Sequence, residues 1–193
     1  MLPQVQASEP RPPSEARAWL ETARRTGTTS ADAQARFGTL APVAPAELHG
    51  RWHGIPLHCR HPLDGLLERF GWRGKAIAGG RAHALLFADG RGGEVALDVR
   101  RLPVGLAVRL RAHRWPGARV AFALVRASLV THWPNARVRS AEHRGRVTAV
   151  LDYEDLPIRD VFARIDETTV LGLMHAPWFD APYAFALERA PHP

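Results

Sequence analysis

The chain has 193 residues, 46% of them hydrophobic, which is enough for one domain with a substantial core. No segment approaches the roughly 18 consecutive apolar residues that a membrane-spanning helix needs, so we expect no membrane association. The net charge of +7 comes from arginines spread along the chain without a nucleic-acid-binding motif, which argues against nucleic acid as a partner.

The N-terminal region begins with residues 1–13, which hold four prolines and no apolar core, so we expect a disordered lead and no secretory signal. Residues 14–25 are predicted to form a helix capped by Ser14. A second short helix follows Thr29 and ends near Gly38. Cys59 is the only cysteine, which excludes an internal disulfide and suits a cytoplasmic protein.

The middle of the chain changes from strand to helix and back. Residues 50–57 are predicted to form a strand. A helix is then predicted from Pro62, at its first position, to Gly71, which ends it. One face of that helix is apolar at helical spacing, through Leu63, Leu66, Leu67 and Phe70.

The rest of the chain favours short strands separated by turn signals. The strands are predicted at 72–77, 83–88, 94–99, 136–141, 146–153, 158–165, 168–174 and 183–189. Residues 102–115 and 119–133 are compatible with either helix or strand. The number and spacing of strands predict a mainly β (α+β) fold: a calycin-like antiparallel β-barrel or strongly curved sheet, with two N-terminal helices and one inserted helix. We expect a single domain over residues 14–190, with the N-terminal helices in 14–44.

Several ordered motifs resemble a known pair of modules. Residues 48–54 read Leu-His-Gly-Arg-Trp-His-Gly, and 61–67 and 71–75 follow with His-Pro-Leu-Asp-Gly-Leu-Leu and Gly-Trp-Arg-Gly-Lys. These motifs are similar to the GxWxG domain, over residues 45–101. Residues 153–162 and 170–174 resemble the DUF4334 domain that usually follows it, over residues 102–190. That family's Tyr-Asp pair appears here as Tyr153-Glu154-Asp155, which leaves open which carboxylate matters.

A looser similarity concerns the strand Gly50-Arg51-Trp52-His53-Gly54, which is similar to the opening strand of lipocalin-like barrels and of nitrobindin-like haem barrels. That similarity implies that Trp52 plugs the closed end and that Gly50 and Gly54 let the strand bend. It also raises a haem alternative, in which His175 at the barrel rim ligates iron. An exposed loop histidine is the simpler interpretation of His175, and we expect no cofactor and no protein-bound metal.

Two charged residues carry the chemical hypotheses. Lys75 is the only lysine beside 25 arginines, and an amine, unlike a guanidinium, can lose its charge when buried. Asp160 shares a strand face with Ile158 and Phe162, so its carboxylate is predicted to point inward. A buried carboxylate must be paired or protonated, and an arginine partner such as Arg146 or Arg164 is the structural interpretation.

The sequence thus predicts a barrel that binds a small, largely apolar ligand. The expected binding residues are Trp52, Trp72, Lys75, Phe87, Tyr153, Asp160, Phe162, Met174 and Phe185. The alternative is an enzyme of the isomerase, cyclase or hydro-lyase type, with Lys75 and Asp160 as catalytic base and acid. The ligand's identity and the oligomeric state stay open.

Overall fold

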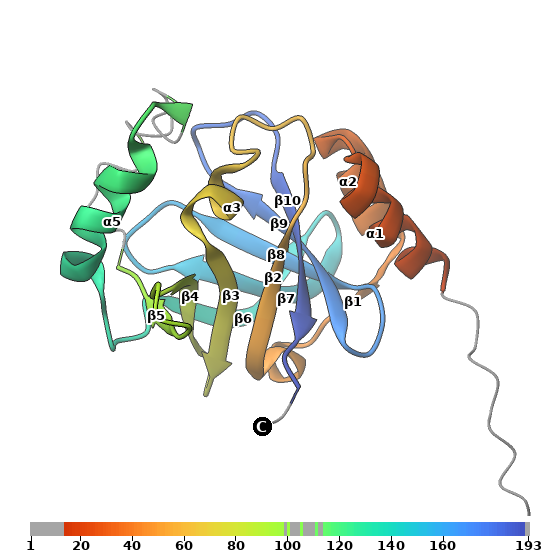
Figure 1. Cartoon of the computed structure of the whole chain (residues 1–193). Helices are drawn as coiled ribbons and strands as arrows, with labels where there is room; N and C mark the ends of the chain where they lie inside the picture. Colours follow the sequence, from red (N-terminus) through yellow and green to blue (C-terminus); the bar gives the residue numbers. More distant parts are fainter. Residues whose placement is uncertain (1–13, 99, 101–104, 106–110, 112–113, 192–193) are drawn as a thin grey trace, which may run out of the picture.

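Eight strands close into one antiparallel barrel in the computed structural model, which describes residues 14–98, 100, 105, 111 and 114–191 (Figure 1). Each strand pairs with the next along the chain, and β10 returns to pair with β2. The predicted barrel is therefore confirmed. Its strands are β2 (Gly50–Pro56), β3 (Trp72–Ala78), β4 (Arg81–Ala88), β6 (Ala136–His143), β7 (Arg146–Tyr153), β8 (Arg159–Arg164), β9 (Thr169–His175) and β10 (Tyr183–Arg189).

Two short strands extend the barrel wall. β1 (Ala41–Pro42) pairs with β8, and β5 (Glu94–Ala96) pairs with β4. The strand predicted over 94–99 is thus shorter than expected. Leu97 continues it only as an isolated bridge to Val130, and Val99 lies outside the described residues.

The wall is weakest between β4 and β6, where only two residue pairs align. Asn135 bridges this joint, because its Oδ1 accepts from the Ala84 amide at 3.0 Å and its Nδ2 donates to the Leu97 carbonyl at 3.1 Å. Helix α5 (Ala118–Leu129) lies beside β4 and β5 (Figure 1). The helix settles the ambiguity over 119–133 and adds a second inserted helix to the predicted one. Most of 102–115 lies outside the described residues, as does the lead 1–13.

Both N-terminal helices form as predicted. Ser14 caps α1 (Glu15–Thr26) by accepting from the Arg17 amide, and Thr29 caps α2 (Ser30–Thr39) by accepting from the Asp32 amide. They lie together on the side of the barrel opposite α5 (Figure 1). Of the described helices, none is long and apolar enough to cross a membrane.

The helix predicted from Pro62 is much shorter than expected, because α3 spans only Leu66–Phe70. The carboxylate of Asp64 accepts from the backbone amides of Cys59 and His61, which holds the preceding residues in a turn. Gly65 then adopts a left-handed conformation, with φ of 81°, immediately before the helix begins. These local hydrogen bonds between the Asp64 side chain and the preceding backbone thus compete successfully with the helix.

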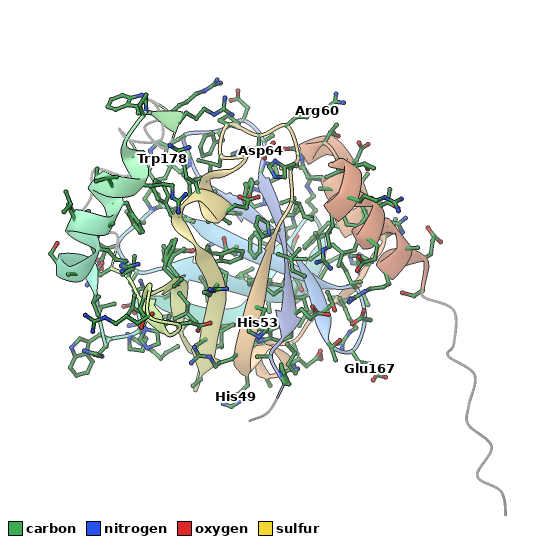
Figure 2. All side chains as sticks on the ribbon, in the orientation of Figure 1. His49, His53, Arg60, Asp64, Glu167 and Trp178 are labelled. Atoms are coloured by element: carbon green, nitrogen blue, oxygen red, sulfur yellow. The ribbon has the colours of Figure 1, made fainter. Side chains whose placement is uncertain are left out.

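The two ends of the barrel differ. At one end, a 3₁₀ helix, η1 (Pro45–Leu48), leads into β2, and the Trp52 Nε1 donates to the Leu48 carbonyl at 2.8 Å. At the other end lie α3 and the loop that joins β9 to β10. Figure 2 shows His49 and His53 near the first end and Asp64 and Trp178 near the second. The closed end is packed, and the second end contains the candidate site.

Candidate functional site

A cavity of about 570 Å³ lies at the α3 end of the barrel. Its volume falls within the roughly 300–1,000 Å³ of small-molecule sites. Barrel strands form its floor, while α3, α5 and the β9–β10 loop form its upper wall. The lining is largely apolar and aromatic, and its main members are Leu66, Leu67, Phe70, Trp72, Leu85, Phe87, Phe122, Ile158, Met174, Trp178, Phe179 and Phe185.

A β-bulge in β3 brings Trp72 and Lys75 to the same cavity. Residues three apart on a regular strand point to opposite faces. The pairing of β3 with β4 shifts register on both sides of Gly74, which has a φ of 136°. The extra residue changes the direction of the side chains that follow it, so the side chains of Trp72 and Lys75 both line the cavity. A Cβ at Gly74 would lie 1.9 Å from the Trp52 carbonyl oxygen, and only glycine fits there.

Two further glycines let aromatic rings lie flat on the neighbouring strand. A Cβ at Gly54 would lie 2.2 Å from the Trp72 ring, and one at Gly172 would lie 2.4 Å from the Phe185 ring. The two rings meet edge to face with their centroids 5.8 Å apart. Gly54 was predicted to bend the strand. Its φ is not positive, and the structure assigns it to this close approach instead.

The polar part of the cavity is a buried ion pair. The Lys75 Nζ lies 2.8 Å from Asp160 Oδ2, and the two side chains are 2% and 1% exposed. The same Nζ donates to the Ala84 carbonyl at 3.0 Å and to the Tyr153 hydroxyl at 3.3 Å. The Lys75 Nζ therefore has three polar partners, two through hydrogen bonds and one through the ion pair.

Aromatic rings surround this cation. The Lys75 Nζ lies 5.3 Å from the Phe185 ring centroid, 5.5 Å from that of Tyr153 and 5.9 Å from that of Trp72. Rings at this range stabilise an ammonium through their negative faces. The cavity thus combines an apolar wall with one concentrated polar spot.

Burial shifts the titration of the acids at this spot. Desolvation raises the pKa of Asp160, and the neighbouring Lys75 charge opposes that rise. Burial also raises the pKa of Tyr153 well above its usual value, and the negative charge of Asp160 adds to this rise. Tyr153 therefore keeps its proton at neutral pH and is a hydrogen-bond donor.

Three polar atoms of the lining have neither a hydrogen-bond partner nor an ion-pair partner among the described residues. They are the Trp72 Nε1, the Tyr183 hydroxyl and Asp160 Oδ1. Their side chains are 8%, 2% and 1% exposed, respectively. Buried polar groups are almost always satisfied in folded proteins, so unpartnered ones around a cavity point to a polar group supplied by a ligand.

The structure brings together seven of the nine residues predicted to contact a ligand. Trp72, Lys75, Phe87, Tyr153, Asp160, Met174 and Phe185 all line the cavity. Trp52 and Phe162 do not. Trp52 lies in the core toward the closed end, where the Arg189 guanidinium stacks on its ring at 4.3 Å. Phe162 is fully buried, and its ring centroid lies 6.2 Å from that of Phe185.

The predicted arginine partner of Asp160 was wrong, because its partner is Lys75. The two arginines named for this role serve elsewhere. Arg146 donates to the Gly38 and Leu40 carbonyls, and Arg164 pairs with Glu47. Lys75 instead reaches Asp160 across the barrel interior, from β3 to β8.

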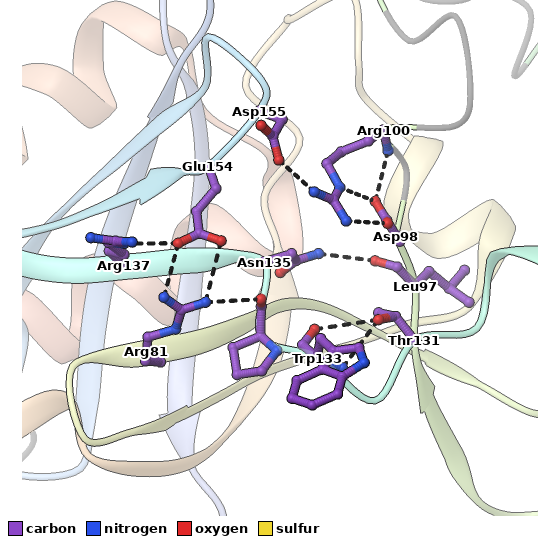
Figure 3. A network of polar contacts seen from close by, with 11 residues as sticks. Arg81, Leu97, Asp98, Arg100, Thr131, Trp133, Asn135, Arg137, Glu154 and Asp155 are labelled. Carbon is purple, nitrogen blue, oxygen red and sulfur yellow. Dashed lines mark hydrogen bonds and ion pairs between the residues drawn. The ribbon is translucent and has the colours of Figure 1, made fainter.

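The two carboxylates after Tyr153 belong to a surface network that Figure 3 shows. Glu154 pairs with Arg81 at 3.0 Å and with Arg137 at 2.8 Å. Asp155 pairs with Arg100 at 2.5 Å. Neither carboxylate lines the cavity. The acidic residue of the site is therefore Asp160, on the next strand.

His175, named for the haem alternative, lies in a different depression. It lies beside His143, with ring centroids 5.2 Å apart, and neither histidine lines the cavity. Burial, His143 and the nearby Arg144 and Arg159 lower the pKa of His175 to about 4. Within the described part of the chain, no cluster of three or more metal-ligating side chains occurs.

Sequence reasoning missed the upper wall of the cavity. Phe122 was missed because the segment that holds it was compatible with helix or strand. Trp178 and Phe179 lie in a loop without periodicity, so no pattern marked them. The apolar stripe of α3 was recognised, but as core, and its Leu66, Leu67 and Phe70 are only partly buried and line the cavity.

Comparisons with known families and structures agree with the motifs that were recognised in the sequence. Residues 35–92 match the model described as GXWXG protein, and residues 134–189 match the domain of unknown function DUF4334. A crystal structure of a protein from Thermomonospora curvata is 23% identical, with a TM-score of 0.66 over 92% of this chain and 99% of that chain. That likeness shows the fold alone. No curated protein matches the sequence.

Proposed function

We propose that the barrel of this chain, in which a GXWXG match precedes a DUF4334 match, binds a small, largely apolar molecule. One observation carries this proposal: an apolar cavity of about 570 Å³ with unpartnered polar atoms in its wall. An apolar ligand there removes its own surface and that of the lining from water. Each Å² of apolar surface so buried contributes about 25 cal/mol.

The cavity favours one compact ligand. Ring pairs along its wall pack at tilted angles, with ring centroids 4.6 Å apart for Phe70 and Phe122 and 5.6 Å apart for Phe87 and Phe122. The Lys75–Asp160 pair supplies the polar contact that fixes orientation. This division into an apolar wall and a few polar groups is typical of small-molecule sites.

Native mass spectrometry of freshly purified protein tests the proposal. We expect a population whose mass exceeds that of the chain by one small molecule, which extraction with organic solvent releases. The matched variants are Leu85→Trp, which narrows the cavity, and Leu124→Trp, which makes the same change at a side chain 78% exposed on α5. The population with extra mass should shrink only in Leu85→Trp. Equal retention in both variants would place the molecule outside the cavity.

Catalysis in the same cavity is the second candidate. The observation that favours it is the contact of a carboxylate and a phenol hydroxyl with one ammonium, since both Asp160 and Tyr153 contact the Lys75 Nζ. The prediction of Lys75 as base loses support, because its nitrogen already has three polar partners, two hydrogen-bonded and one ion-paired. Asp160 and Tyr153 are better placed to move a proton on an enclosed substrate.

A comparison of bound molecules separates the two functions. The molecule recovered from the native protein and from Tyr153→Phe is analysed by mass and chromatography. Pure binding predicts the same compound from both. Catalysis predicts a product from the native protein and an altered, substrate-like compound from the variant.

A further inference from the structure

The polar spot of the cavity has both a free acceptor and free donors. Asp160 Oδ1 accepts no hydrogen bond from the described residues, although its carboxylate is paired with Lys75 through Oδ2. The Tyr153 hydroxyl accepts from the same Lys75 Nζ, so its own proton is free to be donated. The Trp72 Nε1 is a further unpartnered donor of the lining.

We infer that the ligand carries a neutral hydroxyl group as its polar end, and that the cavity rejects the matching carboxylate. This inference rests on the proposed binding function and specifies its ligand class. A hydroxyl donates to Asp160 Oδ1 and accepts from Tyr153 or Trp72. A carbonyl accepts but cannot donate, which leaves Oδ1 unsatisfied. An alkyl group satisfies neither the acceptor nor the donors, and a buried polar group without a partner costs free energy.

The charge balance excludes a carboxylate for a separate reason. A cavity built for an organic anion needs an uncompensated cation, and Lys75 is the only cation among the described residues of the lining. Asp160 already neutralises it at 2.8 Å. A second carboxylate would be desolvated beside the negative charge of Asp160, and like charges at short range disfavour one another strongly in a medium of low dielectric.

A matched ligand series tests the inference on the native protein. 1-Octanol, octanal, octane and octanoate are used to displace the neutral dye N-phenyl-1-naphthylamine, and 2-naphthol is compared with naphthalene to include aromatic alcohols. At pH 8, we expect 1-octanol to bind about five- to 100-fold more tightly than octane, because an unpaired buried polar group costs about 1–3 kcal/mol. Octanoate should also bind more weakly than 1-octanol, because its charge would lie beside Asp160. Octanal should fall between 1-octanol and octane, and 2-naphthol should exceed naphthalene.

An isosteric variant supplies the second test. Asp160→Asn leaves the buried Lys75 charge uncompensated, so its cavity should now prefer octanoate to 1-octanol. Octanoate should also raise the melting temperature of this variant and leave that of the native protein unchanged. The control is Asp152→Asn, which removes a carboxylate paired with Arg139 and Arg159 outside the cavity. It should keep the native preference for 1-octanol.

The outcomes distinguish this inference from the function on which it rests. Octanoate or octane binding to the native protein as tightly as 1-octanol would overturn the hydroxyl assignment while leaving an apolar binding site. Failure of every compound, and of the dye, would overturn the binding function itself. If Asp160→Asn does not fold, the native series alone still decides the ligand class.

Discussion

Lys75 and Asp160 form an ion pair across the full width of the barrel, because three strands separate β3 from β8 in either direction around the ring. Such a contact joins the two halves of the chain. One residue lies in the GXWXG module and the other in the DUF4334 module, so the pair connects the two modules inside one barrel.

A double-mutant cycle measures what this ion pair contributes. Removing one partner leaves a buried charge uncompensated, so Lys75→Met and Asp160→Leu should each lower the free energy of unfolding by about 3–5 kcal/mol. The double variant should lose much less than the sum, because its apolar side chains need no partner. Urea unfolding gives the three values. Additive losses would show that the two residues act independently.

Gly54 is predicted to tolerate no side chain. The Cβ of Gly54→Ala would lie 2.2 Å from the Trp72 ring, and displacing that ring should cost about 1–3 kcal/mol or more of folding stability. Gly38→Ala is the control, since a Cβ within α2 would meet nothing within 4 Å. It should raise stability by about 0.5–1 kcal/mol. Thermal unfolding of both variants is the measurement, and equal effects would refute the close approach.

The strands of the barrel were predicted well, because most of them show alternating apolar and polar residues and end at turn residues. The β6–β7 and β8–β9 hairpins and β10 lie where the patterns placed them, and Ser14 and Thr29 cap the helices as expected. α3 was overestimated, because the apolar stripe is visible in the sequence but the competing hydrogen bonds of Asp64 are not.

The candidate site was predicted only in part. Lys75 and Asp160 were each recognised by residue type, one as the only lysine and the other as a carboxylate on an apolar face. Their contact depends on barrel closure and on the bulge at Gly74, which no local pattern reveals. The upper wall could not be predicted, because α5 and the Trp178 loop reach the cavity only through tertiary packing.

The hydroxyl of Tyr183 is buried without a partner among the described residues, so removing it should not harm the empty barrel. Tyr183→Phe is expected to leave the free energy of unfolding unchanged or to raise it. Tyr153→Phe is the matched contrast, because its hydroxyl accepts from Lys75 at 3.3 Å. Its loss should lower stability by about 1 kcal/mol. The reverse order in urea unfolding would contradict both assignments.

His175 should make the fold sensitive to mild acid. Its pKa is about 4 in the fold against an ordinary 6.5, mainly because of burial and the neighbouring His143. Between these values the unfolded chain binds a proton that the folded chain does not, so stability falls as the pH falls from 6.5 to 4. His175→Gln should flatten that slope in urea unfolding. The exposed His53→Gln should leave it unchanged, and equal slopes in all three proteins would exclude His175 as the cause.

The central claim, an apolar ligand site inside the barrel, is tested most directly by titrating N-phenyl-1-naphthylamine into the native protein, Leu85→Trp and Leu124→Trp. The account predicts saturable dye fluorescence with one site in the native protein and in Leu124→Trp. It predicts a weaker signal in Leu85→Trp, whose larger side chain narrows the cavity. An unchanged, saturable signal in Leu85→Trp, or no saturable signal in the native protein, would contradict it.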